Sequence, residues 1–295
     1  MRLLGLVNPH AGRGAALRQL ERLRVSGSGN HDVAWIVTAS AEQASELILA
    51  APANGTEGVV LVGGDGTVHG VLDALAEAGL PCGVVPAGRG NDFLRNLDAG
   101  RWDGEAFLRG RHLRERRVDL PSVNGTPFAS VACVGFDALV NRLARDRAGY
   151  LGGTAGYVVC VLRALAEFRP FEAEVTVDDW TWSGPITLVA VANGSCYGGG
   201  MCIAPAAEMD DGALDVCIVA EVSRGRLLRE FPRVFRGTHL NRRGVVMRRG
   251  RTVRVVTESP RDIFADGETS GSTPALWSFD RRALRVLVPE REAPA

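Results

Sequence analysis

Near the start of the chain, four apolar runs are each followed by small, polar or glycine-rich residues. These residues are Asn8–Gly14 (NPHAGRG), Thr38, Gly63–Thr67 (GGDGT) and Pro86–Asp92 (PAGRGND). Glycines let backbone N–H groups approach an anion without obstruction by side chains. If the apolar runs are parallel strands, all four segments lie along the carboxyl edge of one sheet, where such folds bind ligands. The pattern therefore predicts a phosphate-binding cleft.

The elements that must hold these segments alternate between short apolar runs and stretches of helical periodicity. This alternation is typical of β-α-β units with a parallel sheet. Strands are expected at Leu3–Val7, Val33–Val37, Val59–Val62 and Gly83–Val85, and helices at Ala15–Leu23, Ala41–Ala51, Val68–Ala78 and Asp92–Leu97. Because the helix at Val68 follows the GGDGT segment, its positive end is expected to point at the cleft.

From about Arg117 the sequence becomes β-rich, with a single helical segment expected at Tyr157–Phe168. The expected strands are Ala173–Val177, Ile186–Ala192, Leu214–Val219, Thr252–Val256, Asp262–Ala265 and Leu284–Val288. We therefore expect an α/β lobe with a parallel sheet at residues 1–120 and an antiparallel β-sandwich lobe at 121–282. A last strand near 283–290 is expected to return to the first lobe.

The cations of this chain restrict its phosphate chemistry. All 34 positively charged Lys and Arg positions are arginines, and they balance 34 acids. Without lysine, a Walker-type phosphate loop, a protein-kinase strand lysine and a Schiff base are all excluded. The GGDGT segment also places Asp65 among the expected phosphates, where a carboxylate needs Mg²⁺ or an arginine as partner. Arg13 is the nearest candidate by topology.

An arginine cluster stands out in the β-rich half. Between Glu221 and Arg261 there are 12 arginines and three acids. A solvated face is one interpretation, and a platform for phosphate or an anionic membrane surface is the other. A nucleic-acid surface is not expected, because the cluster lacks interleaved aromatic residues for base stacking.

The cysteines and the apolar stretches bear on location. Six cysteines without a C-x-x-C pair predict reduced thiols and a cytoplasmic protein. The apolar start of the chain stops at Asn8, and the uncharged run Ala148–Leu162, which ends at Arg163, is too short to span a bilayer. Any membrane contact is therefore expected to be peripheral.

Six motifs occur in an order and spacing that resemble the diacylglycerol kinase catalytic-domain family. They are Asn8-Pro9-x-x-Gly12, Gly63–Thr67, Pro86-x-Gly88-x-x-Asn91-Asp92-Phe93, Val134–Ala138, Ala204-Pro205-x-Ala207 with Asp211-Gly212-x-Leu214-Asp215, and Asp266-Gly267-Glu268. This family includes soluble bacterial diacylglycerol and lipid kinases and the eukaryotic sphingosine and ceramide kinases. The resemblance runs from Asn8 to about Glu268.

The resemblance implies an ATP- and Mg²⁺-dependent lipid kinase with an α/β nucleotide lobe and a β-sandwich lipid lobe. It implies nucleotide contacts from Thr38, Gly64–Gly70 and the loop at Arg89, within a wider expected set of Asn8, Arg13, Thr38, Gly63, Gly64, Asp65, Gly66, Thr67, Gly88, Arg89, Asn91 and Asp92. It implies that Asp211 and the main-chain oxygens of Glu208 and Ala213 hold Mg²⁺. Glu268, beside Asp266, matches the family's proton acceptor, and Asp65 belongs to a charged network at the nucleotide. A homodimer is suggested by relatives alone.

Three positions depart from the family's usual pattern. Arg89 replaces a threonine, Gly70 replaces a glutamate and Arg13 replaces a lysine. The proposed metal and base residues are retained. Two alternatives to a lipid kinase stay open: a kinase of a soluble acceptor, because NAD kinases have a similar GGDGT core, and a non-catalytic nucleotide or lipid sensor.

Overall fold

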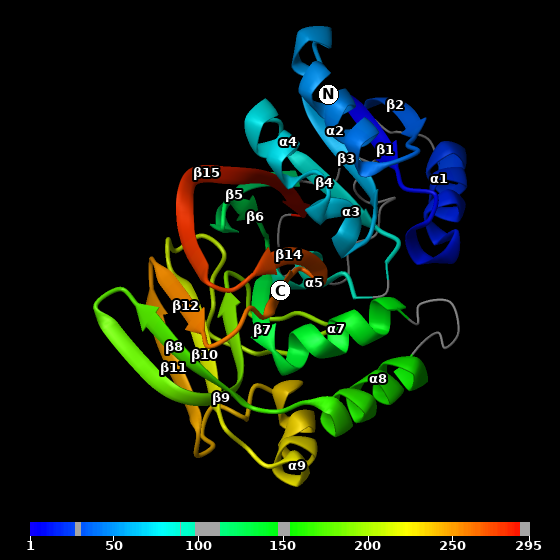
Figure 1. The fold of residues 1–295 in the computed structure, drawn as a ribbon. Helices are drawn as coiled ribbons and strands as arrows, with labels where there is room; N and C mark the ends of the chain where they lie inside the picture. Colours follow the sequence, from blue (N-terminus) through cyan, green and yellow to red (C-terminus); the bar gives the residue numbers. More distant parts are fainter. Residues whose placement is uncertain (27–30, 89, 98–112, 147–153, 290–295) are drawn as a thin grey trace, which may run out of the picture. The chain divides into compact units, whose positions relative to one another are not determined.

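The computed structural model describes residues 1–26, 31–88, 90–97, 113–146 and 154–289 (Figure 1). The chain divides into two compact units. Unit 1 contains Met1–Leu120 and Arg281–Ala295, and unit 2 contains Pro121–Asp280. Two long strands contribute residues to both units: β5 (Leu113–Val123) and β15 (Ala275–Pro289).

Unit 1 is built on a parallel sheet with the strand order β4-β3-β1-β2. The strands are β1 (Arg2–Val7), β2 (Asp32–Val37), β3 (Gly58–Gly63) and β4 (Cys82–Pro86). The end of β15 adds a further parallel strand, with Val286 opposite Cys82. The helices are α1 (Ala15–Ser26), α2 (Ala41–Ala50), α3 (Asp65–His69), α4 (Leu72–Ala78) and α5 (Asp92–Asn96).

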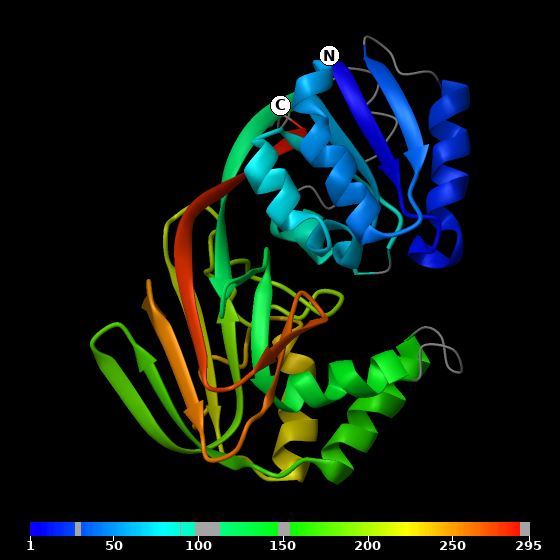
Figure 2. The ribbon, with the colours of Figure 1, turned by 45° about the horizontal axis from the view of Figure 1, so that its top comes forward.

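The order of these strands creates a switch point between β1 and β3. The chain goes from β1 to one neighbour, β2, and then crosses β1 to reach β3 on its other side. Right-handed crossovers then place α1 on one face of the sheet and α2 and α4 on the other, as Figures 1 and 2 show. The loops after β1 and β3 leave toward opposite faces, which opens a crevice at the carboxyl edge of the sheet.

The single helix predicted at Val68–Ala78 is wrong in detail, because the structure has two helices here. The first helix, α3, begins at Asp65, so the aspartate itself occupies the first helical position after Gly64. It ends at His69 with Gly70 as its C-cap, and Val71 leaves the helical region with φ −127° and ψ 10° before α4 starts. The apolar spacing of Val68, Leu72 and Leu75 runs through this break, so periodicity alone does not reveal it.

Unit 2 is a β-sandwich of mostly antiparallel strands. Its strands are β6 (Thr126–Pro127), β7 (Val131–Gly135), β8 (Phe171–Val177), β9 (Trp180–Ala192), β10 (Leu214–Ala220), β11 (Val245–Gly250), β12 (Val253–Thr257), β13 (Asp262–Ala265) and β14 (Glu268–Ser272), with the first part of β15. The first half of β9 pairs with β8, and the second half pairs with β7 and β10. Gly184, at φ 143°, lies where β9 passes from one layer to the other.

The strands of one layer are buried on both faces, and this divides the interior of unit 2 in two. Alternate residues of β7 and β9 belong to different cores: Ala132 and Val134 face the sandwich interior around Trp277, whereas Val131 and Cys133 face the helices. Burial on both sides explains why these strands are continuous apolar runs instead of alternating ones. The β-sandwich lobe and the parallel α/β lobe expected from the sequence are thereby confirmed.

Among the described residues, three helices cover the outer core of unit 2, where the sequence predicted one. They are α7 (Phe136–Asp146), α8 (Thr154–Glu167) and α9 (Arg224–Val234). Helix α9 was not predicted from its sequence, RGRLLREFPRV. Its apolar positions are few among the arginines, and Pro232 inside the segment argues against a helix. None of the helices in the described ranges is long and apolar enough to cross a bilayer.

Candidate active site

A pocket of about 230 Å³ lies at the carboxyl edge of the parallel sheet in unit 1. Its polar lining includes Asn8 after β1, Thr38 after β2, and Gly66 and Thr67 in α3. The structure therefore brings together members of three of the four predicted loops. Apolar side chains, including Leu6 and Val71, line the rest. Such a pocket suits a planar base or sugar beside a polar loop.

Direct hydrogen bonds fix the loops around this pocket. The Asn8 side-chain amide donates to Thr67 Oγ1 at 2.9 Å, which joins the loops after β1 and β3. Asn8 Oδ1 accepts from the backbone N–H of His10 at 3.0 Å, so the amide is oriented from both ends. Thr38 is buried, and its backbone N–H and hydroxyl both donate to the carbonyl of Val7. These bonds preorganise the pocket before a ligand arrives.

The glycines of the predicted cradle allow the loops after β3 and β4 to touch. A Cβ on Gly64 would lie 2.9 Å from the Cα of Gly88, and the reverse contact would be 2.8 Å. Asn91 stabilises the second loop: its Oδ1 accepts from Gly88 N–H, and its Nδ2 donates to the Gly88 carbonyl, both at 3.2 Å. Asn91 adopts a left-handed conformation at φ 49°, which asparagine tolerates better than most residues.

The two acids of these loops are held by backbone and side-chain donors. Asp65 Oδ1 accepts from the Phe93 N–H at 3.0 Å, which ties the start of α3 to the start of α5. Asp92 is buried and accepts from Arg95 Nε at 3.4 Å. Arg13 follows β1 in a short 3-10 turn at φ 54°. Its pairing with Asp65 stays a prediction, and Arg89 lies outside the described residues.

In unit 2, the Asp266-Gly267-Glu268 motif forms the turn between β13 and β14. Asp266 and Gly267 both have positive φ, at 52° and 87°, as a tight hairpin turn requires. The Asp266 carboxylate accepts hydrogen bonds from three consecutive backbone N–H groups, those of Ala129 (2.7 Å), Ser130 (2.8 Å) and Val131 (3.3 Å). Asp266 therefore anchors the turn to the start of β7.

Glu268 lies directly after this anchored turn, as the first residue of β14 and opposite Ala265. It is partly exposed. The backbone at Glu268 is held on one side by the pairing of β14 with β13 and on the other side by the hydrogen bonds of Asp266. The Glu268 side chain therefore extends from a fixed backbone position. This geometry suits a carboxylate that must meet a substrate hydroxyl.

The predicted metal residues lie in the loop before β10. Asp211 Oδ1 accepts from Ala213 N–H at 3.0 Å, and its Oδ2 forms an ion pair with Arg249 of β11. Within the described part of the chain, no three His, Cys, Asp or Glu side chains gather as a metal-binding group. Arg249 is the observed partner of the Asp211 carboxylate, and a divalent ion bound to that carboxylate would compete with it. The Mg²⁺ site at Asp211, Glu208 and Ala213 stays a prediction.

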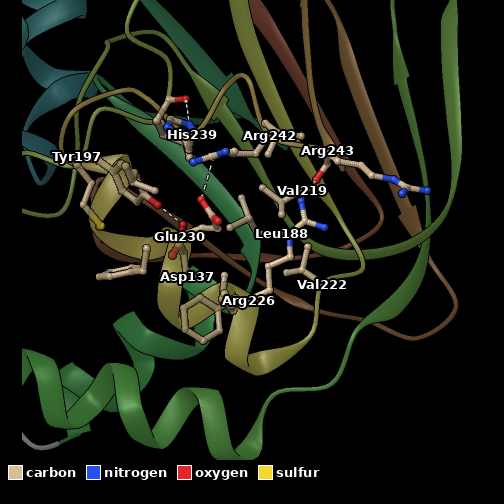
Figure 3. A pocket seen from close by; sticks show the side chains of 17 residues that line it. Asp137, Leu188, Tyr197, Val219, Val222, Arg226, Glu230, His239, Arg242 and Arg243 are labelled. Carbon is tan, nitrogen blue, oxygen red and sulfur yellow. Dashed lines mark hydrogen bonds and ion pairs between the residues drawn. The ribbon is translucent and has the colours of Figure 1, made fainter.

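A second pocket, which the sequence did not reveal, opens in unit 2 between the sheet and α9 (Figure 3). Its walls are mainly apolar: Leu188 and Val219 from β9 and β10, and Leu227, Phe231 and Val234 from α9. The cavity is narrow, with a volume of about 60 Å³. The Val134–Ala138 motif was the available signal, because it places an aspartate within an apolar run.

Two buried ionisable groups line this pocket. Asp137 is 5% exposed and accepts a hydrogen bond from the Tyr197 hydroxyl. Burial raises the pKa of Asp137 from 3.8 to about 6, and the Tyr197 bond opposes that rise. The His239 ring contacts the Ile203 carbonyl at 3.1 Å through Nε2, and burial lowers the pKa of this histidine.

Comparison with known proteins places both units in one family. Residues 2–123 match the Diacylglycerol kinase catalytic domain, and residues 130–288 match the YegS C-terminal NAD kinase beta sandwich-like domain. A protein named Diacylglycerol kinase from Mycobacterium tuberculosis is 35% identical over 303 residues, covering 98% of this chain and 95% of that protein. The chain belongs to the diacylglycerol kinase catalytic-domain family. The predicted family and the predicted class of enzyme, a lipid kinase, are confirmed.

Other members of the diacylglycerol kinase family are more distant. The Diacylglycerol kinase of Bacillus subtilis is 25% identical over 295 residues, covering 98% of this chain and 96% of that protein. A solved structure of a putative diacylglycerol kinase from Bacillus anthracis matches with a TM-score of 0.73 and 23% identity, covering 95% of this chain and 94% of that one. The structural match establishes the shared fold.

Proposed function

We propose that this family member transfers the γ-phosphoryl group of ATP to the free hydroxyl of diacylglycerol or a closely related lipid. The observation that carries the proposal is the apolar pocket under α9, in a chain whose full-length relative is named for diacylglycerol. A soluble sugar or nucleotide does not need a pocket with apolar walls in the second unit of its kinase, whereas an acyl chain does.

The donor site is proposed in unit 1. The adenosine of ATP would enter the pocket lined by Asn8, Thr38 and Thr67, with its phosphates along the glycine backbone of Gly63–Gly66. Mg²⁺ bound to ATP would neutralise phosphate charge during transfer. The role of the protein here is to hold the nucleotide in one orientation, and the Asn8–Thr67 bond supports it.

The acceptor chemistry is assigned to Glu268. Its carboxylate would take the proton from the lipid hydroxyl as the hydroxyl oxygen forms a bond to the γ-phosphorus and the bond to ADP breaks. Asp266 is proposed as a positioning residue, because its carboxylate already accepts from three backbone N–H groups. This division of roles predicts different consequences for the two acids.

The test is transfer of radiolabelled phosphate from ATP to diacylglycerol in mixed micelles, with sphingosine, ceramide and NAD as competing acceptors. Glu268→Gln should lower kcat roughly 10²- to 10⁴-fold without changing the KM for ATP. Glu258→Gln, an exposed acid on another loop, is the matched control. Asp266→Asn should instead lower the stability of unit 2 by about 2 kcal/mol, because a neutral amide is a weaker acceptor for three N–H groups.

Acyl-chain recognition has its own test. Leu227→Trp narrows the pocket from the α9 side, so KM should rise for long-chain diacylglycerol and stay unchanged for a short-chain analogue. Each methylene that enters the pocket should lower KM roughly fourfold in the wild type. Labelled NAD without labelled lipid would instead establish the soluble acceptor. ATP binding without any labelled product would establish a sensor, and both results would overturn the proposal.

A further inference from the structure

Helix α9 has one broad apolar surface, and only part of it packs inside the protein. Leu227, Phe231 and Val234 face the pocket. At the outer edge of this surface, Leu228 is 49% exposed, and Phe235, at the end of the helix, is 43% exposed with its ring 5.9 Å from that of Phe231. Pro232 is exposed between them, and the spacing of four and three residues places all three on one stripe of the helix surface.

Exposed arginines flank this outer stripe. On a helical wheel, Arg224 lies on one side of Leu228, and Arg229, Arg233 and Arg236 lie on the other. Residues 224–249 contain nine arginines and a single acid, Glu230. Glu230 lines the pocket and pairs with Arg229, Arg233 and Arg242 at 3.4, 2.8 and 3.1 Å, so one acid faces several arginines. The outer face is therefore strongly positive around an apolar centre.

We infer that the outer face of α9, defined by Leu228, Phe235, Arg224, Arg229 and Arg236, docks on an anionic lipid bilayer. Exposed apolar side chains ringed by arginines are what an interfacial helix requires, since the former enter the acyl boundary and the latter contact lipid phosphates. A second copy of the chain is a poor occupant, because two such faces would bring like charges together. A nucleic-acid strand would leave Leu228 without a partner.

Docking through α9 has a consequence for the acceptor, which rests on the proposed function. The helix that contacts the bilayer is the same helix whose inner face lines the apolar pocket. A lipid leaving the bilayer would therefore reach the pocket along a single helix, without crossing water. The pocket is narrow in the present structure, so movement of α9 on the bilayer is one way to widen it.

The test is sedimentation of the full chain with phosphatidylcholine vesicles and with vesicles enriched in phosphatidylglycerol, without nucleotide. The wild type should bind the anionic vesicles, and binding should weaken as salt is added. Leu228→Ser with Phe235→Ser should lower the affinity roughly tenfold for each side chain. Arg229→Gln with Arg236→Gln should lower it roughly fivefold for each charge.

The matched control is Leu276→Ser, which removes a leucine of similar exposure (46%) on β15. This variant should bind vesicles like the wild type. Unchanged binding in both α9 double variants, or an equal loss in the Leu276 variant, would overturn the inference. So would a dimer that Leu228→Ser dissociates, or a single-stranded oligonucleotide that displaces the vesicles. The arginine variant keeps the test valid if the apolar variant unfolds on heating at a lower temperature.

Membrane docking and lipid phosphorylation can fail separately. If the wild type binds anionic vesicles but labels no lipid, the proposed function fails and the docking face stands. If it phosphorylates a water-soluble short-chain diacylglycerol but binds no vesicles, the docking inference fails and the kinase stands. The Leu228 and Phe235 variants should retain activity on the short-chain lipid and lose it on vesicles.

Discussion

The buried carboxyl of Asp137 leads to a prediction about stability and pH. We expect Asp137→Asn to stabilise unit 2 at neutral pH, because the amide keeps an oxygen that can accept from the Tyr197 hydroxyl and removes a buried charge. In the wild type, the pKa of Asp137 rises from 3.8 to about 6 on folding, a difference of about 2.2 units. At about 1.36 kcal/mol per unit, ionised Asp137 destabilises the native state by about 3 kcal/mol.

The sign follows from proton binding. Between pH 3.8 and about 6 the native state holds a proton that the unfolded state has released, so the stability of the wild type falls as pH rises through this window. Above about 6 the effect is complete. The advantage of Asp137→Asn should therefore be near zero at about pH 4 and level off at about 3 kcal/mol by about pH 7, a rise in Tm of roughly 6–12 °C.

The assay is thermal or urea unfolding of the wild type and of Asp137→Asn across this pH range. The result is the difference in unfolding free energy between the two proteins at each pH. The difference is needed because buried His239, whose pKa is lowered, has the opposite effect on stability. The contribution of neutral His239 to the stability of the native state is fully present above pH 6.5 and is lost as pH falls. Asp32→Asn, on the exposed start of β2, serves as control. Parallel profiles for Asp137→Asn and the wild type would refute the reasoning, as would a variant that is less stable at neutral pH.

Two further predictions concern the loops. Gly64→Ala would place a methyl group 2.9 Å from the Gly88 Cα. We therefore expect roughly 1–3 kcal/mol of destabilisation, and weaker ATP binding measured by calorimetry. The control Gly225→Ala, which has open space around it, should be neutral or stabilising. Arg249→Met should make Tm depend on Mg²⁺ in the absence of nucleotide, because it frees the Asp211 carboxylate, whereas the wild-type Tm should not respond. A Tm of Arg249→Met that ignores Mg²⁺ would remove Asp211 as a metal ligand.

The parallel sheet of unit 1 could be predicted because its strands are short apolar runs that end in polar loops. The strand predicted at Val59–Val62 is observed as Gly58–Gly63, and the loop residues Asn8, Thr38 and Thr67 meet in one pocket. Topology supplied the convergence: once the strands are parallel, their carboxyl ends share an edge. The break between α3 and α4 could not be predicted, because it depends on the backbone at Val71 and leaves the apolar spacing intact.

The pocket in unit 2 was beyond sequence reasoning for a different reason. Its walls come from α9 and from residues of β9 and β10 that face the helix. These segments are far apart in the sequence, so no local sequence pattern indicates that they line one pocket. Residues such as Val219 read as ordinary strand core. Asp137 was visible only as a polar residue in an apolar motif, and its buried hydrogen bond to Tyr197 depends on a contact across 60 positions.

The arginines of this chain illustrate how one residue type takes several roles that lysine could not fill equally. Arg249 pairs with Asp211, Arg248 stacks at 4.2 Å on the Trp180 ring, and Arg242 bridges to Glu230 beside the pocket. Each of these uses the flat guanidinium, with several donors or an aromatic face, more than it uses a point charge. On the outer face of α9 only the charge and its attraction for phosphate are needed, so replacing Arg229 and Arg236 by lysine should preserve vesicle binding. Arg249→Lys should weaken the Asp211 ion pair, and a double-mutant cycle on Arg249 and Asp211 would measure how much of their coupling lysine retains.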